Sequence, residues 1–389
     1  MSSSGAGALA WLTGMPDGPP DHSRSAVLTR AEAVAAELTE HLGVPVDAGT
    51  IVTGRAALLG LQRRGRISAG GATRLMPTRD GWWALTLSRA DDIAAIPALV
   101  EADTVPDDPW PAIEQWAAQH YGDDAVSRAA LLNLPAARLG ETAAVSPHVR
   151  PSGIQGPPRS PAGLLVADLS SMWAGPLCGR LLAAAGATVV KVESPARPDG
   201  TRSGDQSFYD WINHGKLSYA VDFDRDFDRI QALLVAADIV IEGSRPGVLA
   251  RRGLSPETLS GRDGRVWLRI SGHGPDSHRA AFGDDAAVAG GLVGTSPSGP
   301  VFCGDAIADP LTGLESALAV THSLRGGGGE TIELGMATVA AGYATLPAED
   351  SPAPVTEPTR PQATAHAAPL GADNDAVDAI VRQRNTVPC

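Results

Sequence analysis

The sequence contains very little lysine, since Lys191 and Lys216 are the only two among 31 basic residues. It also lacks an excess of positive charge: its formal net charge is −13. Proteins that bind a phosphate backbone need basic stripes that release counterions, so we expect no nucleic-acid partner. A lysine ammonium is a compact cation that suits contact with a phosphate, which makes both lysines candidate ligand-binding residues. The alternative, that the two lysines have no function and occur by chance in an arginine-rich composition, explains their presence equally well.

Cysteine is also scarce. The three cysteines, Cys178, Cys303 and Cys389, lie far apart and form no Cys-x-x-Cys pair, which argues against a disulfide framework and a structural zinc site. Long apolar runs and a signal-peptide pattern at the N-terminus are missing too. We therefore expect a cytoplasmic protein without membrane association. The histidines do not follow metal-ligand spacing, so we predict no metal; those considered are His214, His273, His278 and His322.

The length of 389 residues exceeds what a single hydrophobic core usually supports, so two domains are expected. A segment with five prolines and no apolar periodicity marks the linker between them. The first expected parts are an N-terminal helical segment (1–54) with a helix at 26–42, and a small α+β domain (55–141) with a helix at 56–63 and a hairpin around 78–81. The linker (142–162) and the main domain (163–345) follow. The last expected part is a tail rich in proline and alanine (346–389) with a short helix near 376–381.

Strand and helix patterns alternate through the main domain, which predicts a doubly wound, Rossmann-like parallel sheet and an α/β fold class. The expected strands are 164–167, 188–193, 217–223, 239–242, 266–270 and 331–334, and the expected helices are 175–185, 227–237, 246–252 and 311–324. A dinucleotide site needs Gly-x-Gly-x-x-Gly after the first strand, but the turn offers only Gly175 and Gly179. A serine hydrolase is also disfavoured, because no Gly-x-Ser-x-Gly elbow is present.

Six short motifs follow one another in this region. They are Asp168-Leu169-Ser170 with Ala174-Gly175-Pro176; Gly186-Ala187 with Val190-Lys191-Val192-Glu193 and Thr201-Arg202; Asn213-His214-Gly215-Lys216-Leu217-Ser218; Arg245-Pro246-Gly247-Val248-Leu249 with Arg251; Ile270-Ser271-Gly272; and Ala308-Asp309-Pro310-Leu311-Thr312-Gly313. Each is weak alone. In this order they make segment 164–343 resemble the class III CoA-transferases, a family that includes formyl-CoA and carnitine CoA-transferases and the related α-methylacyl-CoA racemases.

The resemblance implies a Rossmann-like core that binds coenzyme A, here as an acyl-CoA substrate, with a carboxylic acid as the acceptor. It assigns Asp309 as the catalytic nucleophile. The residues it places along the CoA site are Ala174, Gly175, Pro176, Lys191, Arg202, Lys216 and Arg251. It further implies a homodimer. One departure is Gly243, which stands where the family commonly has an asparagine, so the resemblance does not carry over the hydrogen bond to CoA expected at that position.

Several alternatives stay open on the sequence. Asp309 before Pro310 is also typical of a helix N-cap, and Asp305 is a second candidate nucleophile. Asp284 and Asp285 lie where the racemases have a His-Asp acid/base pair, but no histidine accompanies them, which favours transfer over racemisation. A non-catalytic CoA-binding protein is a further possibility, because the chain lacks the family's usual small domain after residue 334. Residues 67–141 resemble part of that domain, moved ahead of the core.

Overall fold

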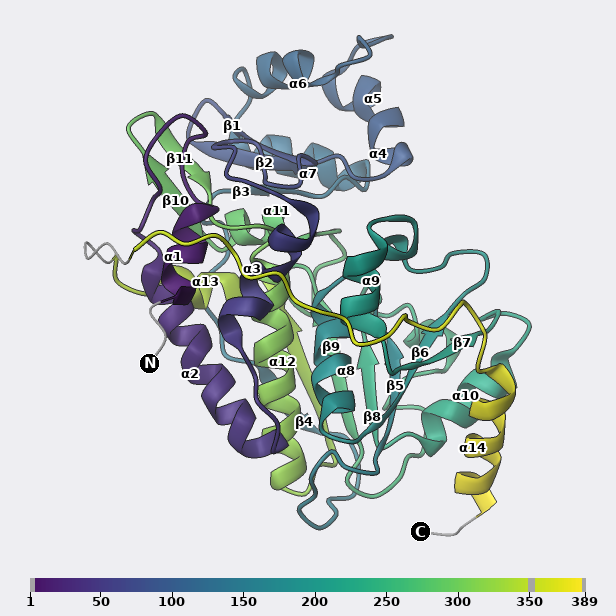
Figure 1. Cartoon of the computed structure of the whole chain (residues 1–389). Helices are drawn as coiled ribbons and strands as arrows, with labels where there is room; N and C mark the ends of the chain where they lie inside the picture. Colours follow the sequence, from purple (N-terminus) through teal and green to yellow (C-terminus); the bar gives the residue numbers. More distant parts are fainter. Residues whose placement is uncertain (1–3, 349–353, 387–389) are drawn as a thin grey trace.

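The computed structural model describes residues 4–348 and 354–386, and its centre is a seven-stranded sheet (Figure 1). Six strands are parallel: β5 (Leu165–Leu169), β6 (Thr188–Glu193), β7 (Leu217–Ala220), β8 (Ile239–Glu242), β9 (Val266–Ser271) and β12 (Glu330–Gly335). The strand order is β4-β12-β9-β8-β5-β6-β7, with β4 (His148–Pro151) antiparallel at one edge. The protein is therefore a mixed α/β protein with a largely parallel sheet. Counted along the chain, the parallel strands lie in the order 3-2-1-4-5-6, as in dinucleotide-binding folds.

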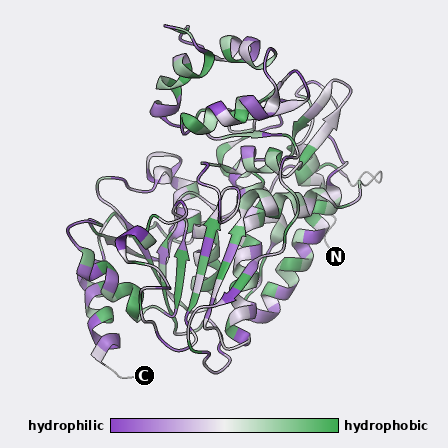
Figure 2. Ribbon diagram, turned by 180° about the vertical axis from the view of Figure 1, so that it is seen from behind, coloured by the Kyte–Doolittle hydropathy of each residue, from purple (hydrophilic) through white to green (hydrophobic). Residues whose placement is uncertain are grey.

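Helices cover both faces of this sheet because successive side chains of a strand point to opposite sides. Val166 faces α8 (Ala174–Ala184) and α12 (Ala308–Arg325), whereas Leu165 faces α10 (Phe227–Ala236) and α14 (Asn374–Thr386). The strands are apolar on both sides, as parallel strands buried between helices must be (Figure 2).

The N-terminal segment forms three helices, α1 (Ser4–Trp11), α2 (Ser25–Leu42) and α3 (Ala48–Leu59), beside α12 (Figure 1). Their apolar side chains join the same core as α8 and α12. The bounds predicted for a helix at 56–63 are wrong, because α3 covers Ala48–Leu59. Asp47 caps the start of α3 by accepting a hydrogen bond from the Thr50 N–H, and Gly60, with φ of 64°, ends α3.

A small antiparallel sheet, ordered β1-β2-β3, lies at the end of the molecule away from α14 (Figure 1). Its strands are β1 (Thr73–Pro77), β2 (Trp82–Thr86) and β3 (Ala136–Arg138), so the predicted hairpin around 78–81 is confirmed. Trp83 and Trp116 are central to its core. Its helices are α4 (Ala90–Ala94), α5 (Ile96–Val100), α6 (Trp110–Ala117) and α7 (Gly122–Leu131).

Between β9 and β12 the chain forms elements that adjoin this small sheet. These are α11 (Gly283–Ala289) and the hairpin of β10 (Val293–Ser296) and β11 (Gly299–Phe302), while α13 (Met336–Ala344) follows β12. The helix predicted at 246–252 shrinks to a 3-10 turn, η2 (Ala250–Arg252), because Gly247 has φ of 76°, which is not helical. The predicted linker, in turn, contains β4.

The C-terminal segment 354–386 packs along the core. It runs past α9 (Gln206–Asn213) and then seals the free edge of β7. The Ser218 N–H donates to the Asp373 carboxylate at 2.8 Å, and the Ala220 N–H donates to the Asn374 side-chain oxygen at 2.9 Å. Helix α14 then packs on α10 through Val377 and Val381, and it is longer than the helix predicted near 376–381. The described helices include none with the length and apolar character that crossing a membrane requires. Cys389 lies outside the described residues.

Candidate functional site

Asp309 lies in the first turn of α12 and is only 9% exposed. The N-cap position is Ile307, so the prediction that Asp309 caps its own helix is wrong. Its carboxyl group instead faces the Ala174 N–H at the start of α8, which acts to lower the pKa of Asp309. The structure thus brings the candidate nucleophile to the Ala174-Gly175-Pro176 turn, where a helix N-terminus favours negative charge.

Two glycines make this approach possible. A Cβ on Gly283 would stand 2.4 Å from the Asp309 Oδ2 atom and 2.3 Å from the Ala306 carbonyl oxygen. A Cβ on Gly313 would stand 2.6 Å from Leu177 and 2.9 Å from the Ala174 carbonyl oxygen. Gly283 therefore leaves room for the carboxyl group, and Gly313 lets α12 pack closely on α8.

Three carboxyl groups and one arginine gather around this point. The Arg55 guanidinium, from α3, lies 2.7 Å from the Asp305 Oδ1 atom, and its charge also acts on Asp284 and Asp309. Asp305 is 1% exposed, and the Asp284 Oδ1 atom accepts a hydrogen bond from the Ala306 N–H at 2.9 Å. One cation therefore faces three carboxyl groups, so the cluster holds protons more tightly than isolated aspartates do.

The pKa values follow from that imbalance. Burial raises the pKa of Asp309 to about 7; Arg55 opposes the rise, while Asp284 adds to it. Burial and the neighbouring Asp305 raise the pKa of Asp284 to about 6. Such values are typical of groups that exchange protons near neutral pH, and they mark functional sites more often than structural ones.

Aromatic side chains close the cluster on one side. Arg55 lies over the rings of Trp173 and Phe208, with its central carbon 5.7 Å and 5.6 Å from their centroids. The Trp173 ring nitrogen is buried and has no hydrogen-bond partner in the described structure. Backbone strain flanks the site as well, since Met172 and Ala306 have left-handed φ values of 72° and 44°. Strain of this kind is often retained where function requires it.

Both lysines are buried and paired with carboxylates. The Lys191 Nζ atom donates to Asp199 at 2.7 Å and to the Ser170 carbonyl oxygen at 3.1 Å. The Lys216 Nζ atom donates to Asp168 at 2.9 Å, and its other hydrogen bonds go to the Pro176 carbonyl oxygen and the Asn213 side chain. Their charges are thus neutralised inside the protein, on strands and turns that surround the start of α8.

Arg202 lies beside them and forms a two-pronged pair with Glu193, at 2.8 Å and 2.6 Å. Lys191, Arg202 and Lys216 line one shallow depression with no room for a water molecule, which Ala367 and Ala368 of the C-terminal segment also line. The Arg202 guanidinium donates to the Ala368 carbonyl oxygen at 3.3 Å. Three of the predicted CoA-site cations therefore lie together, under the C-terminal segment.

Asp210 holds that segment in place. It accepts hydrogen bonds from the His366 Nδ1 atom at 2.7 Å and from the Ala367 N–H at 2.9 Å. Burial raises the pKa of Asp210, but the hydrogen bonds from Ala367, His366 and Gln206 outweigh it and lower the pKa below its usual range. We call residues 354–373 the strap.

Arg251 lies apart from the other predicted cations, on η2. A larger hollow of about 470 Å³ opens beside this turn, at the carboxyl ends of β8, β9 and β12. Its lining includes Pro246 and Gly247 of the predicted Arg245–Leu249 motif. The charged groups in that lining are three glutamates, Glu242, Glu257 and Glu333, and Arg269, which pairs with all three, so they offer no free cation to a phosphate.

Asp284 and Asp285, at the position where the racemases have a His-Asp pair, form hydrogen bonds with hydroxyl and backbone groups. The Asp285 Oδ1 atom accepts from the Thr86 hydroxyl at 2.8 Å and from the Phe282 N–H at 3.0 Å, and the Thr73 hydroxyl donates to Asp284. Within the described part of the chain, no histidine hydrogen-bonds to either group. Arg55 is the site residue that sequence reasoning missed, because no pattern in the N-terminal segment links α3 to residues 250 positions away.

Comparison with known proteins identifies the family of this chain. The sequence pattern described as CoA-transferase family III matches residues 162–372, which is more than half of the chain. The chain belongs to CoA-transferase family III. This confirms the family to which the ordered motifs pointed.

Curated relatives include the succinyl-CoA–D-citramalate CoA-transferase of Chloroflexus aurantiacus, 31% identical over 202 residues, or 47% of this chain and 50% of that protein. The formyl-CoA:oxalate CoA-transferase of Afipia carboxidovorans is 30% identical over 45% of this chain and 46% of its own length. The chain thus spans about half the length of the curated relatives it matches. A CaiB/BaiF family protein from Brucella suis aligns with a TM-score of 0.44 and 28% identity, over 49% of this chain and 56% of that structure.

Proposed function

We propose that this protein transfers CoA from an acyl-CoA thioester to a carboxylic acid, with Asp309 as the nucleophile. The observation that carries the proposal is the position of the buried Asp309 carboxyl group beside the start of α8, where α12 packs closely on Ala174, in a chain that belongs to CoA-transferase family III. An N–H group at a helix start can stabilise the negative charge that forms on an attacked carbonyl.

The proposed reaction proceeds through covalent intermediates on Asp309. A carboxylate oxygen attacks the thioester carbonyl carbon, the carbon–sulfur bond breaks, and CoA leaves as the thiolate with an acyl-aspartyl anhydride on the enzyme. The thiolate then attacks the aspartyl carbonyl carbon and releases the first acid, which leaves an aspartyl-CoA thioester. The acceptor carboxylate attacks that thioester and releases the CoA thiolate, which leaves an anhydride between the acceptor and Asp309. The thiolate then attacks the acceptor's carbonyl carbon, which forms the new acyl-CoA and regenerates the Asp309 carboxylate.

Arg55 has a defined part in this proposal. Attack requires the carboxylate form of Asp309, whose pKa burial raises to about 7. The Arg55 charge opposes that rise, so it increases the fraction of Asp309 that is ionised at neutral pH. Asp309 is also covered, so a thioester must displace neighbouring groups to reach it.

The CoA site is part of the proposal. We assign the nucleotide end of CoA to the region of Lys191, Arg202 and Lys216, and the strap must move for CoA to contact them, because Ala367 and Ala368 line the same depression. Arg251 would join the site from η2. The homodimer and the division into a small domain (55–141) and a core (163–345) remain proposals of the same kind, and sedimentation of the purified chain tests the first.

Covalent trapping tests the nucleophile. Purified protein incubated with labelled succinyl-CoA or formyl-CoA, each with glutarate or oxalate as acceptor, should yield a hydroxylamine-sensitive adduct on Asp309. Asp309→Asn should lose both adduct and transfer. Asp305→Asn, which changes a buried carboxylate of the same cluster, should keep the adduct. A label on Asp305, or none with any acyl-CoA tested, would contradict the assignment.

CoA binding without transfer is the second candidate, and the burial of Asp309 favours it, because a covered carboxyl group is not free to attack a thioester. It predicts that Asp309→Ala binds CoA as tightly as the wild type and that neither protein turns over. Racemisation predicts solvent deuterium at the α-carbon of a 2-methylacyl-CoA, which transfer does not produce.

A further inference from the structure

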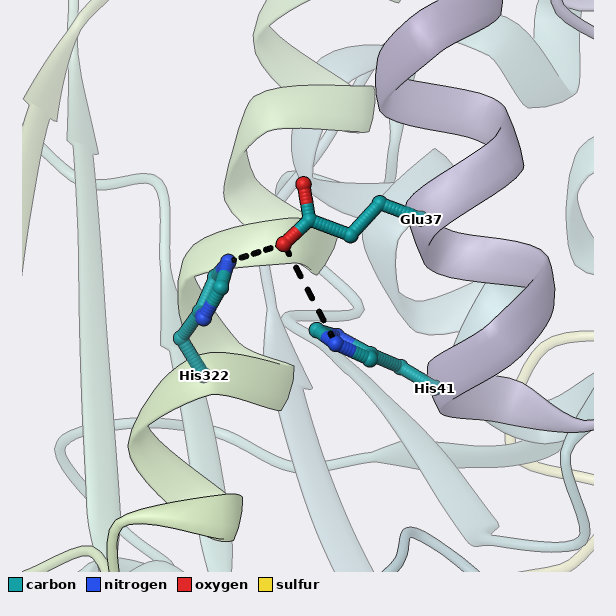
Figure 3. A group of neighbouring side chains, drawn as sticks. All are labelled: Glu37, His41 and His322. Carbon is teal, nitrogen blue, oxygen red and sulfur yellow. Dashed lines mark ion pairs between the residues drawn. The ribbon is translucent and has the colours of Figure 1, made fainter.

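A second group of chemically active side chains lies at the opposite end of α12 from Asp309. Glu37 and His41 project from one face of α2, one helical turn apart, and His322 projects toward them from α12 (Figure 3). Thirteen residues separate Asp309 from His322 along α12, which corresponds to roughly 20 Å. The group is therefore separate from the carboxylate cluster.

One carboxylate oxygen serves both histidines. The Glu37 Oε1 atom lies 2.9 Å from the His322 Nε2 atom and 4.0 Å from the His41 Nε2 atom. The three ligand atoms lie within 4.8 Å of one another. Ligand atoms around a tetrahedral zinc ion lie roughly 3.3 Å apart, given bonds of about 2.0–2.1 Å. Glu37 and His322 are 43% and 55% exposed, so their side chains can close the remaining gap.

The buried histidine is held in the orientation that a metal ligand needs. His41, whose side chain is 9% exposed, places its Nδ1 atom 3.0 Å from the Thr321 hydroxyl oxygen. That hydroxyl donates its own proton to the Leu318 carbonyl oxygen at 2.9 Å, so it accepts the proton on Nδ1. The Nε2 atom of the neutral ring then carries a lone pair aimed at a carboxylate. The His41 Nε2 atom and the Glu37 carboxylate are therefore two acceptors that face each other, and a cation between them would bind to both.

We propose that Glu37, His41 and His322 bind one divalent transition-metal ion between α2 and α12. Two imidazoles and a carboxylate suit zinc, cobalt or nickel rather than magnesium or calcium, which prefer oxygen ligands. Exposure on one side leaves room for water as the remaining ligand. The ion would join the N-terminal segment, which carries Arg55, to the core. This proposal departs from the sequence-based prediction of no metal, because residue spacing does not reveal that His41 and His322 meet.

Metal titration of the full chain tests the proposal. Protein freed of metal by a chelator should bind one Zn²⁺ per chain in competition with a chromogenic chelator. His322→Ala, which removes an exposed ligand, should raise the Kd at least about 10-fold, and Thr321→Val should raise it by a smaller factor because it frees the His41 ring. His148→Ala is the matched control, since His148 is 63% exposed and pairs with Glu333 without a second histidine. It should leave the Kd unchanged.

Two further measurements separate a metal site from a simple ion pair. Zn²⁺ should raise the melting temperature of the wild type and of His148→Ala, but not of His322→Ala. Bound Co²⁺ should give visible absorption bands that His322→Ala abolishes. The proposal is overturned if the wild type binds no Zn²⁺, or if it binds with the same Kd as His322→Ala. Circular dichroism establishes that each variant is folded.

Discussion

Arg55 of α3 and Asp305, which directly precedes the turn into α12, are 250 residues apart in the chain and lie 2.7 Å apart in the structure. This pair ties the N-terminal segment to the carboxyl groups around Asp309. Arg55 also supplies a positive charge that acts to lower the pKa values of Asp284, Asp305 and Asp309. Its removal should therefore affect both stability and the protonation of the site.

Arg55→Ala should lower the free energy of unfolding by about 3 kcal/mol at pH 8, because three buried carboxyl groups lose their cation. The loss should be smaller at pH 5, where those groups can take up protons instead of remaining charged. Urea denaturation at both pH values measures it. Arg225→Ala, which removes an arginine whose side chain is 89% exposed, is the control. An equal loss at both pH values would contradict the electrostatic explanation.

Asp285 should make stability fall as pH rises. Burial raises its pKa to about 7, above the value of about 3.9 for an unfolded chain, so its stabilising contribution is complete below pH 4 and is lost as pH passes 7. Relative to Asp285→Asn, the wild type should lose on the order of 3 kcal/mol between pH 4.5 and pH 8. Denaturation curves across this range measure the difference. Asp124→Asn, an exposed carboxylate on α7, should run parallel to the wild type.

Gly313→Ala should lower the free energy of unfolding by about 2 kcal/mol, because the new methyl group would meet Leu177 and the Ala174 carbonyl oxygen. Gly342→Ala is a matched control in α13, where nothing lies within 4 Å of the added carbon. That change should raise stability by about 0.5–1 kcal/mol, since alanine favours a helix. Equal effects of the two substitutions would show that α8 and α12 do not need the close contact.

Asp210→Ala should release the strap. Loss of the hydrogen bond from the Ala367 N–H, worth about 1 kcal/mol or slightly more, should speed amide hydrogen exchange at Ala367 by a factor of about 10. The Ala220 amide, which donates to Asn374, should exchange at an unchanged rate. If Ala367 exchanges equally fast in the wild type, Asp210 does not hold the strap.

The sequence predicted the central sheet well because its strands are short apolar runs bounded by turns. The strands predicted at 188–193 and 239–242 have those bounds in the structure, and that at 266–270 is one residue longer. Local signals failed where long-range contacts decide. Strand β4 lies in the predicted linker, because four residues become a strand only by pairing with β12.

The site was predicted in part, and for similar reasons. Asp309 and the Ala174-Gly175-Pro176 turn, both motif residues, lie near each other because α12 packs closely on α8 at Gly313. The lysines were expected to face phosphates, but sequence does not show that Asp199 and Asp168 pair with them. Neither Arg55 nor the meeting of His41 with His322 leaves a local signature, because helix packing across the N-terminal segment produces both.

The backbone of β7 is protected from solvent and from other chains by Asp373 and Asn374, which follow their β7 partners by 155 and 154 residues and are therefore synthesised later. Until then its N–H and C=O groups form an open template to which another extended chain can bond. Molecules in which proteolysis separates Asp373 and Asn374 from the core would expose this template permanently. Their characteristic failure would be self-association through β7, even with every residue around Asp309 intact.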